Sequence, residues 1–263
     1  MRTFLLIILA VSAIEWAGQS RTSAEDLVKF ESAASETGRG TFEIQGYLTK
    51  PRGKGPLPAV VLLHSCLGVP ANRQALAKTI ASWGYVVLFV DDFTTRGLKE
   101  TCAVDFKEAG SDAFGALVYL STLPYVDPSR IAAVGYSQGG DTALGIAASR
   151  YRGAFAISAD LKFKAAAAFY PPCANLGSAA LNIPTLILVG ELDDVTPAAD
   201  CSRLAANQPD VKLVVYPGAH HLFDDPSVAH GMRLLGMWLQ YDAGSAVRAK
   251  VELRQFLSHE LGR

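Results

Sequence analysis

A serine flanked by glycines is the first stretch of the chain whose residue types suggest chemistry. Residues 135–139 read "GYSQG", and Ser137 lies between the apolar run "RIAAV" (130–134) and a helical pattern from about Gln138 to Arg150. A strand, a tight turn and a helix are the context of a nucleophile elbow, which exposes the serine hydroxyl and needs small neighbours. The helix then favours negative charge at its first N–H groups. The alternative is a plain helix cap, because serine caps helices well.

A serine hydroxyl is a weak nucleophile at neutral pH and needs a base within hydrogen-bond distance. Around such an elbow the chain order is serine, acid, histidine. Of the five histidines, only His220 and His221 directly follow a predicted strand, in "VVYPGAHHLFDD". His230 and His259 fall in segments with a helical pattern, so we expect them to be surface or packing residues. His64 precedes the serine, and we expect it to fix its loop by hydrogen bonds.

The candidate acids follow the preceding apolar run, in "TLILVGELDDVTP" (185–197). They are Asp193 and Asp194, with Glu191 as a weaker candidate. A buried carboxylate here would orient the imidazole and stabilise its charged form. Each aspartate has an alternative role as a turn or helix cap before Pro197.

The histidine loop also raises the alternative of a metal site formed by His220, His221, Asp224 and Asp225. We disfavour it because these residues are crowded into one loop and no distant ligand cluster accompanies them. Hydrolysis through a serine needs neither a metal nor another cofactor.

An oxyanion hole needs two backbone N–H groups directed at the developing charge. In the elbow arrangement one comes from the residue after the nucleophile, which is Gln138, and the other from the loop after an early strand. The loop "LLHSCLG" (62–68) has that position, and Cys66 is its candidate donor.

These residues must be positioned by buried strands that alternate with helices. Alternating apolar and polar side chains predict a half-exposed strand at 41–51, and apolar runs predict strands at 58–65, 85–92, 130–136, 164–172, 183–191 and 211–218. Helical spacing predicts helices at 72–84, 105–123, 138–150 and 198–207, and a mostly helical tail from 227 to 262. This alternation predicts a single α/β domain, with a mostly parallel central sheet flanked by helices. Ligands bind at the carboxyl ends of such strands, where the candidate residues lie.

Composition and the N-terminus narrow the class of protein further. The chain has 263 residues, 50% hydrophobic and 19% charged, with a net charge of −1 and no basic block, so we expect no nucleic-acid partner.

The N-terminus predicts a signal peptide over about residues 1–24, because Arg2 precedes an apolar stretch at 4–14 and small residues follow it. We expect a mature domain of residues 25–263, secreted or periplasmic after bacterial-type export, without a stable membrane span. An uncleaved anchor is the alternative.

Export to an oxidising compartment changes how the four cysteines are interpreted. Cys66, Cys102, Cys173 and Cys201 allow three pairings, and none of them has the spacing of a zinc site. We favour Cys173–Cys201 and Cys66–Cys102, which would brace loops on one face of the sheet. Free buried thiols are the alternative.

The chain resembles the dienelactone hydrolase family of α/β-hydrolases in five segments, taken in order: "IQGYLTKP", "VVLLHSCLG", "GYSQGG", "LILVGELDDVTP" and "YPGAHHLF". The resemblance covers about residues 41–240. It implies an α/β-hydrolase fold with Asp193 as the acid, His221 rather than His220 as the base, and Cys66 as the early oxyanion donor.

The chain also departs from the pattern that this resemblance implies. Ser137 stands where dienelactone hydrolase proper has cysteine, Ser65 where it has glutamate, and Asp225 where it has a substrate-binding arginine. Arg96, in "DDFTTRG", matches the other arginine, so substrate binding is one expectation for it and a loop salt bridge is the other.

The sequence therefore predicts an exported serine hydrolase that cleaves carboxylic esters through Ser137, His221 and Asp193. A lactone hydrolase or a peptidase with the same three residues is the first alternative. A non-catalytic binding protein is the second, because fold does not imply function. The expected partner is a small-molecule ester or lactone.

Overall fold

A central sheet organises the molecule. The structure, a computed structural model, describes residues 25–36, 40–104, 106–151 and 153–262. The predicted signal peptide, residues 1–24, lies outside the described residues. Within them the sheet has eight strands in the order β1-β2-β4-β3-β5-β6-β7-β8. The strands are β1 (Glu25–Glu31), β2 (Glu43–Thr49), β3 (Leu57–Leu63), β4 (Val86–Asp91), β5 (Val126–Tyr136), β6 (Ala165–Phe169), β7 (Thr185–Gly190) and β8 (Val211–Tyr216).

The sheet is mostly parallel, as the sequence predicts. Strands β3 to β8 pair in parallel, while β1 and β2 are antiparallel to their neighbours. The central strands are apolar along their whole length because helices cover both of their faces: every residue of β3, "LPAVVLL", is buried.

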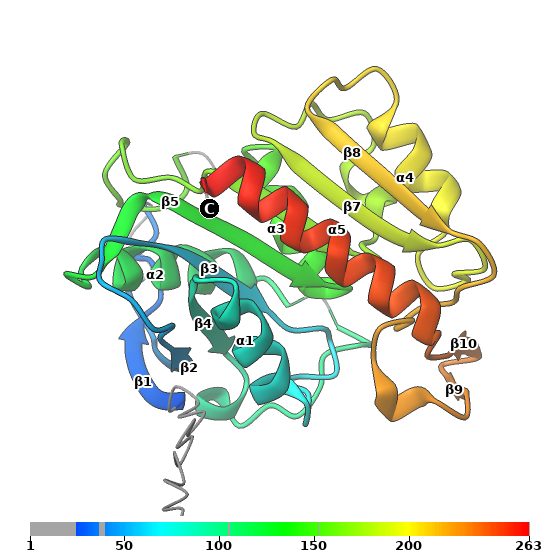
Figure 1. Cartoon of the computed structure of the whole chain (residues 1–263). Coiled ribbons are helices and arrows are strands. Elements are labelled where there is room, and N and C mark those ends of the chain that lie inside the picture. The colour runs from blue at the N-terminus through cyan, green and yellow to red at the C-terminus, as the bar shows by residue number, and fades with distance from the viewer. Residues whose placement is uncertain (1–24, 37–39, 105, 152, 263) are drawn as a thin grey trace, which may run out of the picture.

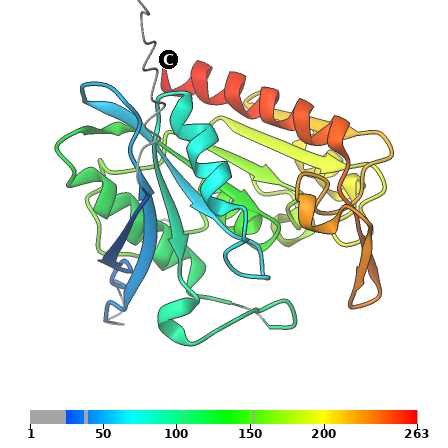
Figure 2. The same cartoon turned by 60° about the horizontal axis from the view of Figure 1, so that its bottom comes forward.

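Five helices pack on the sheet in the described part of the chain (Figure 1). They are α1 (Arg73–Ser82), α2 (Ala109–Ser121), α3 (Gln138–Ala147), α4 (Ala198–Ala205) and α5 (Ala243–Leu261). Helices α1 and α5 cover one face, whereas α2, α3 and α4 contribute to the core on the other. Figure 2 shows α1 and α5 together on the same side of the sheet. The architecture is that of a single α/β domain, and each predicted inner strand and each helix up to residue 207 is present.

The predicted tail is wrong over residues 227–240. In place of a helix, the chain forms the 3-10 turn η3 (Pro226–Val228) and a hairpin of β9 (Met232–Leu234) and β10 (Met237–Leu239) before α5 begins. The hairpin turns at Leu235 and Gly236, both at positive φ, which is the geometry of a tight two-residue turn. An isolated bridge between His221 and Leu239 and a bond from the Trp238 N–H to Asp194 attach the hairpin to the sheet loops.

Strand β1 was not predicted from the sequence. Its residues "EDLVKFE" carry four charges and are mostly exposed or partly buried, so they lack the apolar run that indicates an inner strand. It pairs along its full length with β2 at the edge of the sheet. Charged residues suit this position because they discourage further strands from adding to the edge.

Across the described residues, no helix combines the length and the apolar character needed to cross a membrane.

Candidate active site

The turn from β5 into α3 places Ser137 at the carboxyl edge of the sheet. Ser137 has φ 52° and ψ −111°, outside the helical region, while Gln138 begins α3. A side chain at Gly135 would come within 2.0 Å of the Gly139 carbonyl oxygen, and one at Gly139 within 2.4 Å of the Leu63 carbonyl oxygen. Glycine is therefore required on both sides, and the serine is held in a strained turn rather than as an ordinary helix cap, since its side chain makes no capping hydrogen bond.

The structure brings together the three residues predicted as nucleophile, base and acid. Nε2 of His221 lies 3.0 Å from Oγ of Ser137, and Nδ1 of His221 lies 2.8 Å from Oδ2 of Asp193. All three residues are buried. They come from the loops after β5, β7 and β8, so the parallel sheet juxtaposes residues that are up to 84 positions apart.

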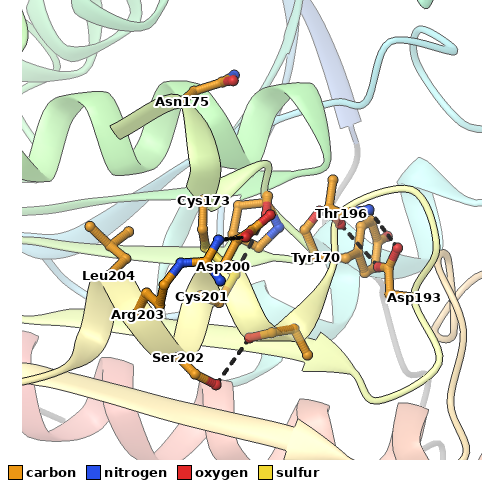
Figure 3. Close-up of a disulfide and its surroundings, with 12 residues drawn as sticks. Tyr170, Cys173, Asn175, Asp193, Thr196, Asp200, Cys201, Ser202, Arg203 and Leu204 are labelled. Carbon is orange, nitrogen blue, oxygen red and sulfur yellow. Dashed lines mark hydrogen bonds and ion pairs between the residues drawn. A yellow bond between two sulfur atoms is a disulfide. The ribbon is translucent and has the colours of Figure 1, made fainter. Parts of the chain in front are cut away.

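Three further donors hold the Asp193 carboxylate. Its Oδ1 accepts hydrogen bonds from the backbone N–H groups of Val195 and Thr196, at 2.9 and 2.7 Å. The Thr196 hydroxyl lies 3.0 Å from Oδ2 and also 3.0 Å from the Tyr170 carbonyl oxygen (Figure 3). Sequence reasoning missed Thr196 and the Tyr170 ring, whose centroid lies 4.6 Å from that of His221. The segment "DDVTP" carried the only available signal, because an aspartate followed by a threonine three residues later is typical of a side-chain-capped turn.

The other candidate acids and the neighbouring histidine make different contacts. Asp194 accepts the Trp238 N–H and anchors the hairpin, while Glu191 accepts the Gly218 N–H at 2.9 Å. His220 is partly exposed, and its Nδ1 lies 3.0 Å from the Leu192 carbonyl oxygen. In each pair of adjacent candidates, one residue therefore belongs to the hydrogen-bonded chain that ends at Ser137, and its neighbour lies outside that chain.

The two predicted oxyanion donors lie near the serine: Gln138 directly follows Ser137, and Cys66 lines the same pocket as Ser137. The Gln138 N–H belongs to the first turn of α3, where N–H groups have no partner within the helix. Cys66 lies in the loop after β3, and its N–H has no backbone acceptor among the described residues. Thr101 connects the two: its N–H donates to the Cys66 carbonyl at 2.8 Å and its hydroxyl to Oε1 of Gln138 at 2.9 Å.

The structure pairs the cysteines in the favoured way, as Cys66–Cys102 and Cys173–Cys201. The first disulfide lines the pocket in front of the serine and ties the Cys66 loop to the segment that carries Thr101. The second joins η2 (Cys173–Leu176) to α4, the helix that follows the Asp193 turn in the chain (Figure 3).

A small apolar pocket opens on Ser137. It has a volume of about 80 Å³, and four of its lining residues come from the hairpin that the sequence did not predict: Leu234, Leu235, Met237 and Leu239. The rest of the lining comes from the serine and histidine, from the Cys66 loop and from three further positions: Cys102, Val195 and Leu222. The arrangement can hold an apolar acyl or alcohol group against the serine.

Arg96, predicted to bind substrate, instead forms a buried ion pair. Its guanidinium contacts the Asp112 carboxylate at 2.9 and 3.0 Å and the Asp92 carbonyl at 2.6 Å, and Arg96 does not line the pocket. Burial, reinforced by the nearby Asp92 charge and opposed by Arg96, raises the pKa of Asp112 to about 8. The loop salt bridge is therefore the role that the structure supports.

His64 is held beneath the Cys66 loop. Its Nδ1 lies 2.8 Å from the Ser65 carbonyl oxygen and its Nε2 lies 2.7 Å from Oδ1 of Asp92. Burial opposes the charged form of His64, but the hydrogen bond and charge of Asp92 outweigh burial and raise the pKa of His64. These contacts match the structural role expected for it.

The disfavoured metal arrangement is not assembled. No group of three or more His, Cys, Asp or Glu side chains among the described residues is placed to hold a metal ion. Asp224 is bonded to the Tyr170 hydroxyl, at 2.8 Å. His230 is exposed in a turn rather than in the predicted helix, and His259 is exposed on α5.

Fold and site together define an α/β-hydrolase. The sequence matches the profile of the dienelactone hydrolase family over residues 44–261, and the chain belongs to that family. A putative carboxymethylenebutenolidase of Synechocystis is 26% identical over 84% of this chain and 93% of its own length. Cutinase 1 of Thermobifida cellulosilytica is 29% identical over 59% of this chain and 55% of its own length.

The solved structures agree with the fold. A putative dienelactone hydrolase from Klebsiella pneumoniae superposes with a TM-score of 0.65 at 20% identity, over 89% of this chain and 99% of its own. Family and relatives make the protein an ester-bond hydrolase.

Proposed function

We propose that the protein is an exported serine esterase in which Ser137 is the nucleophile, His221 the general base and Asp193 the orienting acid. The observation that carries the proposal is the hydrogen-bonded chain from the Ser137 hydroxyl through both ring nitrogens of His221 to the Asp193 carboxylate. A serine hydroxyl is activated when it is hydrogen-bonded to a base and a third group holds that base in position.

The reaction proceeds in two halves. As Ser137 Oγ attacks the ester carbonyl, its proton moves to Nε2 of His221, and the N–H groups of Cys66 and Gln138 bind the oxyanion. The imidazolium returns that proton to the departing alcohol, leaving an acyl-serine. Water then attacks the acyl group, giving its proton to His221, and the acid leaves as Ser137 recovers a proton. Asp193 stays ionised throughout and stabilises the imidazolium.

The lining of the pocket supports an ester with a modest apolar group. Leu234, Leu235, Met237 and Leu239 form one wall, and the cavity of about 80 Å³ suits a short chain. The cutinase and carboxymethylenebutenolidase relatives support esters and lactones respectively. We therefore retain lactone hydrolysis as the second candidate on the same site.

The direct test is Ser137→Ala, assayed with p-nitrophenyl butyrate. We expect kcat to fall roughly 10⁴-fold or more, and we expect the unmodified protein but not the variant to react with a fluorophosphonate probe. Wild-type turnover by the variant would refute the assignment. A folded wild-type protein that neither hydrolyses the ester nor reacts with the probe would favour the non-catalytic binding protein.

A substrate panel separates the remaining activities. Esters of graded acyl length, a dienelactone and an aminoacyl anilide would distinguish an esterase, a lactone hydrolase and a peptidase. We expect the highest kcat/KM for short-chain esters, and a dienelactone hydrolysed a hundred times faster would reverse the order of the two candidates.

Export is supported by the two disulfides, since disulfides persist in oxidising compartments. We expect the mature protein to begin near residue 25. N-terminal sequencing of protein recovered from the periplasm or the medium tests this, and a protein retained in the cytoplasm with Met1 in place would refute it.

A further inference from the structure

Tyr170 has a backbone conformation that tyrosine rarely adopts. It directly follows β6 with φ 39°, in the left-handed region that favours glycine, and it is 2% exposed. Its N–H donates to the Leu188 carbonyl on β7 at 2.6 Å, a contact that helps to fix this conformation. Backbone strain at a bulky residue persists only where the surroundings over-determine it, and such residues cluster at active sites. The conformation of Tyr170 therefore calls for a functional explanation.

Tyr170 contacts both the proposed base and the turn that holds the proposed acid. Its ring packs against the imidazole of His221, with ring centroids 4.6 Å apart and planes inclined at 58°. Its carbonyl oxygen lies 3.0 Å from the hydroxyl oxygen of Thr196 (Figure 3). That hydroxyl oxygen lies 3.0 Å from Oδ2 of Asp193 and 3.3 Å from Nδ1 of His221. A displacement of Tyr170 would therefore disturb the surroundings of the base and of the acid together.

The hydroxyl of Tyr170 is anchored by a carboxylate that has no part in the proposed proton transfer. It donates to Oδ1 of Asp224 at 2.8 Å. Burial raises the pKa of Tyr170 well above its usual value, so the hydroxyl stays protonated and remains a donor. Burial also raises the pKa of Asp224 to about 6, although the hydrogen bond from Tyr170 opposes that rise, so the carboxyl is ionised at pH 8. A hydrogen bond to an ionised acceptor is stronger than one between neutral groups.

The bond between Tyr170 and Asp224 connects two loops of the site. Tyr170 follows β6, whereas Asp224 lies three residues after His221 in the loop that follows β8. The bond spans 54 positions of the chain. Between His221 and Asp224, the ring of Phe223 also packs edge-on against the Tyr170 ring, at a centroid distance of 5.5 Å. Because loops move more than the strands they connect, these contacts restrain the histidine loop against the end of an inner strand.

We infer that Tyr170 and Asp224 are positioning residues, which hold His221 and Asp193 in the geometry that proton transfer requires. Neither residue lines the apolar pocket in front of Ser137, so their effect is exerted through the base and the acid rather than on the substrate. Misplacing a catalytic group by about 1 Å can lower a rate about 10²-fold. The inference rests on the proposed esterase function and adds to it two residues beyond the three that carry the proton transfer.

The test removes each end of the bond in turn, with p-nitrophenyl butyrate at pH 8. Tyr170→Phe keeps the ring but loses the donor, and Asp224→Ala loses the acceptor. We expect kcat, normalised to the folded fraction from circular dichroism, to fall about tenfold in each variant. KM should stay close to the wild-type value, because neither side chain lines the pocket. A purely structural role would lower the folded fraction and leave the normalised kcat unchanged.

A conservative variant and a matched control assign the loss to the bond. Asp224→Asn keeps an acceptor for the Tyr170 hydroxyl and should retain more of the wild-type kcat than Asp224→Ala. Tyr216→Phe removes the hydroxyl of another tyrosine that is 2% exposed and packs on Phe223, at a centroid distance of 5.0 Å. In the described part of the chain, no ring contact or side-chain hydrogen bond joins Tyr216 to the three proposed catalytic residues, so this control should keep the wild-type kcat.

The double variant Tyr170→Phe with Asp224→Ala tests whether the two residues act as a unit. Its kcat should be no lower than that of the slower single variant, because residues that act through one bond have non-additive effects. Should Asp224→Ala fail to fold, the comparison of Tyr170→Phe with Tyr216→Phe decides on the same expected loss.

Three results would overturn the inference while leaving the esterase proposal intact. They are a wild-type normalised kcat in Tyr170→Phe, an equal loss in Tyr216→Phe, and a double variant whose loss is the product of the two single losses. Absence of ester hydrolysis by the wild-type protein would instead refute the proposed function.

Discussion

The two disulfides offer a matched pair for testing the oxyanion assignment. They close loops of similar size, with sequence separations of 36 and 28 residues. On loop-closure entropy each stabilises the fold by about 3.5–4 kcal/mol, and the two differ by only about 0.2 kcal/mol. Their positions differ, because Cys66–Cys102 lines the pocket and carries a proposed oxyanion donor whereas Cys173–Cys201 does not line it. The same covalent change therefore has the same expected loop-closure cost and different expected costs in catalysis, while Cys173 and Cys201, 1% and 0% exposed, add a cost in stability because their replacements are buried.

We compare Cys66→Ser with Cys102→Ser against Cys173→Ser with Cys201→Ser. Both double variants retain every backbone N–H and should lose about 3.5–4 kcal/mol of unfolding free energy through loop closure. The second variant should lose more in urea, because its two serine hydroxyls are buried. Losing one oxyanion donor costs about 10²–10³ in kcat. The Cys66 loop keeps its bonds from the Thr101 N–H and within Ser65–Gly68, at 2.8 and 3.0 Å, so displacement should be partial. We expect kcat to fall about tenfold in the first variant and by less than about threefold in the second.

The assay is p-nitrophenyl butyrate hydrolysis, normalised to the active-site concentration from fluorophosphonate labelling and to the folded fraction from circular dichroism. Equal kcat values for the two variants would refute the argument, because they would show that the Cys66 N–H is positioned without its disulfide or does not bind the oxyanion. A larger loss on removing Cys173–Cys201 would place the critical constraint at the Asp193 turn instead.

Three further predictions follow from the contacts of the site. Thr196→Val removes the hydroxyl bonded to Asp193 but leaves two backbone donors, so we expect kcat to fall about tenfold and stability by about 1 kcal/mol; unchanged kcat would contradict a positioning role. His220→Ala should keep kcat/KM within about threefold, whereas His221→Ala should lose roughly 10⁴-fold, and a reversed order would refute the assignment of the base. Burial raises the pKa of Asp224 to about 6, so its stabilising contribution is present below pH 4 and is lost as the pH rises through 6. Relative to Asp224→Asn, the wild type should lose about 2 kcal/mol between pH 4 and pH 7 in urea unfolding, and a difference that does not vary with pH would show that this carboxylate is not perturbed.

The inner elements of the fold were predictable because their signals are local. Strands such as β3 and β7 are continuous apolar runs, since helices cover both faces, and Gly84 ends the α1 pattern with φ 100°. The antiparallel edge and the hairpin were not predictable in this way. Strand β1 is too charged to resemble an inner strand, and the β9–β10 hairpin depends on contacts to Asp194 and His221, which lie elsewhere in the chain.

By itself, the sequence determined the type of chemistry: a serine on a glycine-flanked turn, carboxylates and histidines after later strands, and four cysteines to brace the loops. These features are local, because each depends on the end of one strand and the residues that follow it. The residues themselves left the choice between neighbours open, and the family resemblance favoured His221 and Asp193. Only the tertiary structure shows where each neighbour lies. It gave His221 and Asp193 to the serine, His220 to the Leu192 carbonyl and Asp194 to the hairpin, and it withdrew Arg96 into an ion pair with Asp112. These contacts depend on the directions in which adjacent side chains point. The packing of distant strands and loops sets those directions, and the order of residues alone does not.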